Sequence, residues 1–210
     1  MGAFAIKPRV GGSCDMILRA VNDAFRRDLD RLAAAAAAGK GGAAHVREGW
    51  EYFKELFRVH LDLEERELWP RVERAVAGRP AERAVLADLR AGRARLDPLI
   101  DGVDAALAGG GDLPAAVRDL RTALEARLRT EEAAALPLAE AALPPAEWEA
   151  FAAEAGRRCE ARTSLFVPWV VDGIAPIERS RFLTSLPEPL RDLNRVTWEP
   201  TYRKRRLWSV

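Results

Sequence analysis

Apolar residues in the first 140 positions recur in alternating steps of three and four over four separate stretches. Such steps place the apolar side chains on one face of a helix, and four such faces are typical of a helix bundle. Gly/Pro-rich breaks separate the stretches: GKGG at 39–42, AGRP at 77–80 and AGGGDLP at 108–114. No stretch alternates with the period of a β-strand, so the pattern predicts an all-α protein.

Each of the four predicted helices carries polar residues inside its apolar stripe. The stripes are Leu18, Asn22, Phe25, Leu29 and Leu32; Trp50, Phe53, Phe57, His60 and Glu64; Leu86, Leu89, Arg93, Leu96, Ile100, Val103 and Leu107; and Leu113, Val117, Leu120, Leu124, Arg127, Glu131, Ala134 and Leu138. A buried charge is costly unless it is paired or holds a ligand. One polar interruption on every helix therefore predicts a buried polar layer.

The last third of the chain has a different character. LPPAEW at 143–148 opens a fifth, shorter predicted helix that runs to about Arg158. Residues 164–210 are rich in proline and aromatic residues, and we expect them to wrap the bundle with short helices around 177–185 and 187–194.

The predicted architecture is an up-down four-helix bundle over residues 1–143, with a C-terminal helix and wrapping extension over 144–210 in the same compact domain.

The 210 residues carry 33 Lys and Arg against 32 Asp and Glu, a net charge of +1, which argues against a nucleic-acid or anionic-membrane surface. Two cysteines exclude a disulfide framework and a cysteine-rich metal site. No apolar run approaches the roughly 18 residues of a membrane span, and the N-terminus lacks a secretory pattern. We expect a cytoplasmic protein whose partner is a small molecule.

The polar layer contains residue types that bind metals in other bundles, where inward carboxylates and histidines hold the ions. His60 and Glu64 lie four residues apart, so both side chains can reach one ion. Glu131 and Glu132 lie on the facing stripe region of the fourth predicted helix, and Asp97 lies one turn after Arg93 on the third.

The sequence around these residues resembles the hemerythrin-like (HHE) domains. HLDLEERELWP at 60–70 resembles their His-x-x-x-Glu helix, and RLRTEEAAALP at 127–137 is similar to its second copy. VNDAFRRDLDRL at 21–32 and GRARLDPLI at 92–100 are similar to the other two ligand helices. The tail, with FVPWVVDG and LPEPLRDLNRVTWEPTYRKRRLW, resembles the C-terminal extension of bacterial members. The resemblance covers nearly the whole chain and implies a four-helix bundle with a non-haem di-iron site for oxygen binding, oxygen sensing, or peroxide or nitric oxide chemistry.

The ligand pattern of that family is altered in this sequence. Three of its histidine positions hold Asn22, Arg93 and Arg127, while the pair His60 and Glu64 matches the pattern. Arginine is not a metal ligand at ordinary pH, and its positive charge repels a cation.

Two ion pairs are therefore expected in place of the metals: Arg127 with Glu131, and Arg93 with Glu64. This interpretation predicts no cofactor. Iron is the alternative cofactor, and its retained ligands would be His60, Glu64, Glu131 and Glu132.

Three functions remain open. In the first, a metal-free enzyme clamps an anionic or enolisable molecule with Arg93 and Arg127, while His60 and Glu64 transfer protons in an isomerisation, cyclisation or elimination. The ligand-binding residues of this first reading are Asn22, Asp97, Glu131 and Glu132. In the second, the layer is a salt-bridge network of a structural or regulatory protein. In the third, the protein binds a residual ion and handles oxygen, peroxide or nitric oxide.

Overall fold

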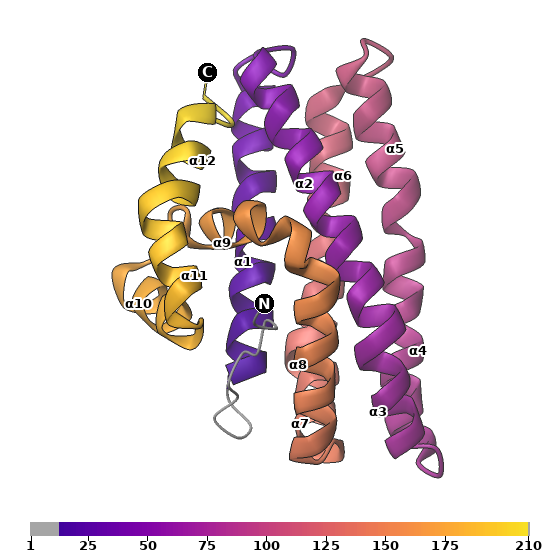
Figure 1. Ribbon diagram of the computed structural model, residues 1–210. Helices are drawn as coiled ribbons and strands as arrows, with labels where there is room; N and C mark the ends of the chain where they lie inside the picture. Colours follow the sequence, from indigo (N-terminus) through magenta and orange to yellow (C-terminus); the bar gives the residue numbers. More distant parts are fainter. Residues whose placement is uncertain (1–12, 210) are drawn as a thin grey trace.

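The computed structural model describes residues 13–209, and every regular element in that part of the chain is helical (Figure 1). The α-helices are α1 (Ser13–Ala37), α2 (Ala44–Leu63), α3 (Trp69–Ala75), α4 (Pro80–Ala94), α5 (Leu96–Leu107), α6 (Leu113–Thr130), α7 (Leu136–Ala142), α8 (Pro145–Cys159), α9 (Thr163–Val171), α10 (Pro176–Ser185), α11 (Glu188–Leu193) and α12 (Glu199–Arg205). The π-helical turns are η1 (Glu64–Leu68), η2 (Glu131–Ala135) and η4 (Asn194–Trp198), and η3 (Glu160–Arg162) is a 3₁₀ turn.

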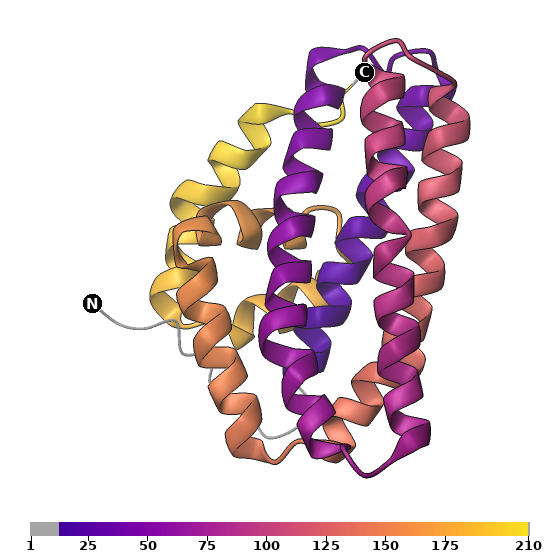
Figure 2. The same cartoon turned by 90° about the vertical axis from the view of Figure 1, so that its right-hand side faces the viewer.

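Four long rods form the bundle: α1, α2 with α3, α4 with α5, and α6 with α7 (Figures 1 and 2). Short loops join them at alternate ends, and these loops coincide with the Gly/Pro-rich breaks. At the start of α6 the Asp112 side chain accepts a hydrogen bond of 3.1 Å from the backbone N–H of Ala115. Pro114 occupies the first turn, where its missing N–H costs nothing. The predicted all-α helical bundle is confirmed.

Two rods contain a π-helical turn at matching places. Glu64 and Glu131 each open such a turn, and each is followed six residues later by a proline, Pro70 and Pro137. A proline inside a helix lacks a donor and clashes with the carbonyl four residues earlier. The wider turn accommodates this defect, and such turns occur often at functional sites.

The π-turn also corrects one part of the sequence prediction. The fourth stripe was expected to continue through Ala134 and Leu138, but the side chains that are fully buried there are Ala135, Leu136 and Ala139. The extra residue in η2 rotates the following helix, so the buried face moves on by one position. The first two stripes are buried as predicted.

Buried apolar residues form two clusters, and the polar layer separates them. On α1, Phe25 belongs to one cluster and Leu18 to the other, with the buried Asn22 between them. On the rod formed by α6 and α7, Leu128 belongs to the cluster of Phe25 and Ala135 to the cluster of Leu18, with the buried Glu131 between them. The layer is therefore an interior feature of the bundle.

The C-terminal extension packs against α1 and α2. Helix α8 runs beside α2, and α9 to α12 cover the adjoining side (Figure 1). The indole of Trp169, fully buried in α9, donates a 2.7 Å hydrogen bond to the carboxylate of Asp28 on α1. The fifth helix and both predicted tail helices are present as α8, α10 and α11. None of the described helices has both the length and the apolar character needed to cross a bilayer.

Candidate functional site

The guanidinium of Arg127 lies at the centre of the polar layer. It donates one 2.6 Å hydrogen bond to Glu64 Oε2 and another of 2.6 Å to Glu131 Oε2. The side chain of Arg127 is 1% exposed, and both carboxylates are fully buried. The predicted pair of Arg127 with Glu131 is confirmed, and Arg127 also makes the pair with Glu64 that was expected of Arg93.

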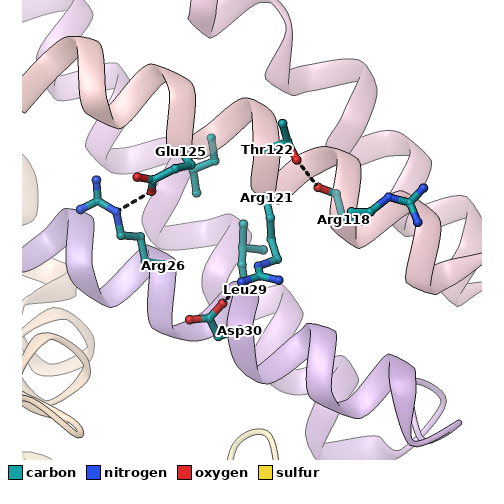
Figure 3. A pocket seen from close by; sticks show the side chains of 8 residues that line it. Arg26, Leu29, Asp30, Arg118, Arg121, Thr122 and Glu125 are labelled. Atoms are coloured by element: carbon teal, nitrogen blue, oxygen red, sulfur yellow. Dashed lines mark hydrogen bonds and ion pairs between the residues drawn. The ribbon is translucent and has the colours of Figure 1, made fainter.

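A chain of polar contacts connects this centre to the surface. Asn22 donates to Glu131 Oε1 at 2.9 Å and to Glu132 Oε1 at 3.1 Å. Arg26, one turn further along α1, donates to both oxygens of Glu132 and, at 2.8 Å, to Glu125. Figure 3 shows the outer end of this chain, where Arg26 and Glu125 line an open surface pocket between α1 and α6. Arg26 was not among the predicted site residues, although its spacing of four residues from Asn22 places it on the same helix face.

His60 lies on the other side of the centre. Its Nε2 is 3.2 Å from Glu64 Oε1, and neither atom has a hydrogen-bond partner among residues 13–209. The imidazole also lines a small apolar pocket of about 80 Å³ between α1, α2, α8 and α9. Thus one histidine connects an apolar space to the buried carboxylates.

Burial determines the protonation of these groups. It lowers the pKa of His60 to about 4 and, together with repulsion from Glu64, raises the pKa of Glu131 to about 7. It also raises the pKa of Glu64. Burial alone would lower the pKa of Arg127, but attraction to Glu64 and Glu131 outweighs it and raises the pKa. At neutral pH the imidazole is uncharged, and both protonation states of Glu131 are accessible.

The expected position of Arg93 is wrong. Its side chain is 23% exposed and pairs with Asp97 at 2.5 Å and with Glu65 at 3.5 Å, outside the polar layer. Gly92 faces the layer instead, since a Cβ there would lie 3.4 Å from Cβ and Cγ of Arg127. A stepping pattern of three and four residues does not distinguish position 92 from 93, and an arginine is long enough to reach acids on the surface.

Asp97 is also outside the layer, with an exposed side chain. Of the eight predicted site residues, the structure brings together six: Asn22, His60, Glu64, Arg127, Glu131 and Glu132. The polar layer therefore draws on three of the four rods.

A substitution at Arg93 is expected to have little effect on stability. Arg93→Ala removes a partly exposed ion pair, so the free energy of unfolding should fall by less than about 1 kcal/mol. Urea unfolding followed by circular dichroism measures this change. A loss several times larger would mean that Arg93 contributes to the buried layer.

The depressed pKa of His60 predicts how stability varies with pH. The unfolded chain takes up a proton at His60 near pH 6.5, whereas the folded chain does so near pH 4. Folding is therefore penalised as the pH falls from about 6.5 to about 4, and this penalty is absent above about pH 7. We expect the wild type to lose stability relative to His60→Gln across that window. The exposed His45→Gln is the matched control, because these are the two histidines of the chain, and it should follow the wild type. Parallel curves for the wild type and His60→Gln would contradict the burial of His60.

The residues present do not fit a two-metal centre. Ligand atoms of His60, Glu64 and Glu131 lie within 4.8 Å of one another, as those of metal ligands do. However, one oxygen of each carboxylate is bound to Arg127, and the second oxygen of Glu131 accepts from Asn22. The guanidinium thus occupies the space between the carboxylates and supplies the positive charge that an ion would bring.

Comparison with known proteins supports the likeness seen in the sequence. The family model described as the hemerythrin HHE cation binding domain matches residues 16–139, more than half of the chain. No curated protein and no solved structure matches the chain.

Proposed function

Because the chain belongs to the hemerythrin HHE cation-binding family, we propose that its polar layer is a form of that site in which Arg127 has taken the place of metal, and that it acts as a metal-independent acid–base centre on a small enolisable molecule. The observation that carries the proposal is the buried guanidinium bound to both carboxylates at 2.6 Å. An arginine in this position offsets one of the two negative charges of Glu64 and Glu131 without any ion.

His60 is the group proposed to take the substrate proton. The uncharged imidazole can accept a proton, and Glu64 Oε1, 3.2 Å away, would stabilise the imidazolium that forms. The small pocket beside His60 provides the space in which a substrate would meet it. Glu131, with its pKa of about 7, can hold or release a proton at neutral pH.

The structure removes support from the anionic substrate of the sequence-based hypothesis. That hypothesis relied on two arginines that converge on the ligand. Arg93 pairs with Asp97 and Glu65 outside the layer. The guanidinium of Arg127 donates its hydrogen bonds to two buried carboxylates rather than to a ligand. An enolisable, uncharged molecule remains as the proposed substrate.

Nitromethane, a small neutral carbon acid, tests the proposed chemistry. Proton NMR in D₂O follows the exchange of its hydrogens for deuterium. We expect the protein to accelerate this exchange, and His60→Gln to reduce the acceleration by about 10²–10⁴-fold, the usual effect of losing a general base. His45→Gln should retain full activity. Equal rates for wild type and His60→Gln would contradict the proposal.

A second candidate function is the binding of a single divalent ion. It is favoured by the grouping of His60, Glu64 and Glu131, and by the two atoms of that group that lack a hydrogen-bond partner. Two unpaired ligand atoms beside a guanidinium are a poor site for an ion that prefers about four ligands. A purely structural salt-bridge network, the remaining alternative, predicts no dependence of proton exchange on His60.

A further inference from the structure

The small pocket beside His60 is formed jointly by the bundle and the C-terminal extension. Leu56, Val59, His60 and Leu63, spaced along one face of α2, line one wall. The facing wall comes from α8, where Ala152, Ala155, Gly156 and Cys159 share a face with the same spacing. Ala152, Ala155 and Gly156 carry little or no side chain, which leaves the space open, while Phe151 of the same helix also lines it. This wall lies beyond residue 139, where the match to the family model ends.

Among the residues that the structure describes, none with a charged side chain lines the pocket. Three of its residues carry polar side-chain groups: His60, Cys159 and Thr163. The hydroxyl of Thr163 is engaged, because it donates to the backbone carbonyl of Cys159 at 3.1 Å. Burial keeps His60 uncharged by lowering its pKa to about 4, and burial raises the pKa of the Cys159 thiol. A charged ligand would lose its hydration here and find no counter-charge.

His60 provides a polar contact for a ligand in this apolar space. The residue is 5% exposed and lines the pocket, and its Nε2 lies 3.2 Å from Glu64 Oε1, which leaves Nδ1 as the ring nitrogen that can serve a ligand. As an uncharged imidazole it can accept a hydrogen bond from a ligand that carries one donor.

The volume limits the size of the ligand. A cavity of 150 Å³ holds a molecule such as benzene, so a pocket of about 80 Å³ accommodates a ligand of roughly three or four heavy atoms.

We infer that this pocket binds a small, neutral, largely apolar molecule with one hydrogen-bond donor directed at His60, and that the C-terminal extension, through the small residues of α8, sets which molecules fit. The inference rests on the proposed function, because this pocket is the space through which a substrate would reach His60. Beyond that function, it names the class of ligand, and it assigns the selectivity for ligands to α8, which lies outside residues 16–139.

Two isomers test the inference. Ethanethiol and dimethyl sulfide have the same atoms, but only ethanethiol carries an S–H donor, and acetate is a charged probe of similar size. Each is titrated into the full chain, with a phosphine reductant present to keep Cys159 reduced, while NMR follows the methyl signals of Leu56 and Val59. We expect both sulfur compounds to bind saturably, ethanethiol more tightly, and acetate not to bind.

Matched variants locate the binding. Ala155→Leu fills the pocket and should weaken both sulfur compounds at least tenfold, whereas Ala153→Leu, on the exposed face of the same helix, should leave binding unchanged. His60→Leu should abolish the preference for ethanethiol. Absence of binding to the wild type, tighter binding of acetate, equal affinity for the two isomers, or unchanged binding by Ala155→Leu would overturn the inference. Binding of the sulfur compounds without His60-dependent exchange of nitromethane would instead count against the proposed function alone.

Discussion

Arg127→Ala is expected to lower the free energy of unfolding by about 3–5 kcal/mol, because it leaves Glu64 and Glu131 buried without their partner. Chemical denaturation followed by circular dichroism measures the loss. Arg129→Ala is the matched control, since Arg129 lies two residues away on the same helix, is 74% exposed, and makes one ion pair with Glu125. Its cost should stay within about 1 kcal/mol.

A simultaneous apolar replacement separates pairing from packing. Changing Glu64, Arg127 and Glu131 together to Leu, Met and Leu removes the charges without leaving any of them unpaired. This variant should be much more stable than Arg127→Ala, since apolar replacement of a complete buried ion network is often neutral or stabilising. Unfolding of Arg127→Ala that matches the wild type would mean that Arg127 does not bind the two carboxylates.

Arg127→His is expected to give the protein a metal site. The substitution removes the guanidinium from between the carboxylates and places an imidazole four residues before Glu131, which repeats the spacing of His60 and Glu64. Four candidate ligands would then converge in the buried layer, which is the number that a tightly held ion commonly requires. We expect this variant to bind one Co²⁺ per chain, measured by metal analysis and by the visible absorption of the bound ion.

Arg129→His controls for the added histidine, because it lies on the exposed face of the same helix. It should bind no more Co²⁺ than the wild type. If Arg127→His also fails to bind the ion while remaining folded, the guanidinium is not what excludes metal from this layer.

Much of the fold follows from the periodicity of apolar residues. The four rods, their Gly/Pro-rich breaks and the helix at α8 occur where the pattern predicts them. The pattern fails after Glu131, where the register of buried residues moves by one position to Ala135 and Ala139. Steps of three and four residues assume a regular α-helix, so they do not allow for the extra residue of a π-helical turn. The prolines six residues after Glu64 and Glu131 were the signal in the sequence that the helix is irregular there.

The candidate site was predictable where local spacing determines the contact. The pair of Arg127 and Glu131 follows from their separation by four residues on one helix. The pair of Arg127 and Glu64 joins two rods, and its assignment required the rotation of each helix about its own axis. Arg93 was misplaced for this reason, since only the packing shows that Gly92 faces Arg127.

The pocket beside His60 could not be predicted from the sequence. The small residues of α8 form a pocket wall only because the extension packs along α2, and the sequence does not show that packing. In the sequence alone, Ala155 and Gly156 are small residues of the kind found in many helices, and they do not indicate a pocket. Their effect appears only when the facing wall of α2 is in place.

The metal content of the wild-type protein is the most direct test of the central claim, that Arg127 occupies the position of metal in this layer. The full chain is produced in iron-supplemented medium, purified without chelator, and measured by mass spectrometry for iron, manganese and zinc together with its ultraviolet–visible spectrum. We expect every metal far below one ion per chain and no absorption beyond that of the aromatic residues. One or two bound ions per chain, lost in a Glu64→Ala variant, would contradict the claim.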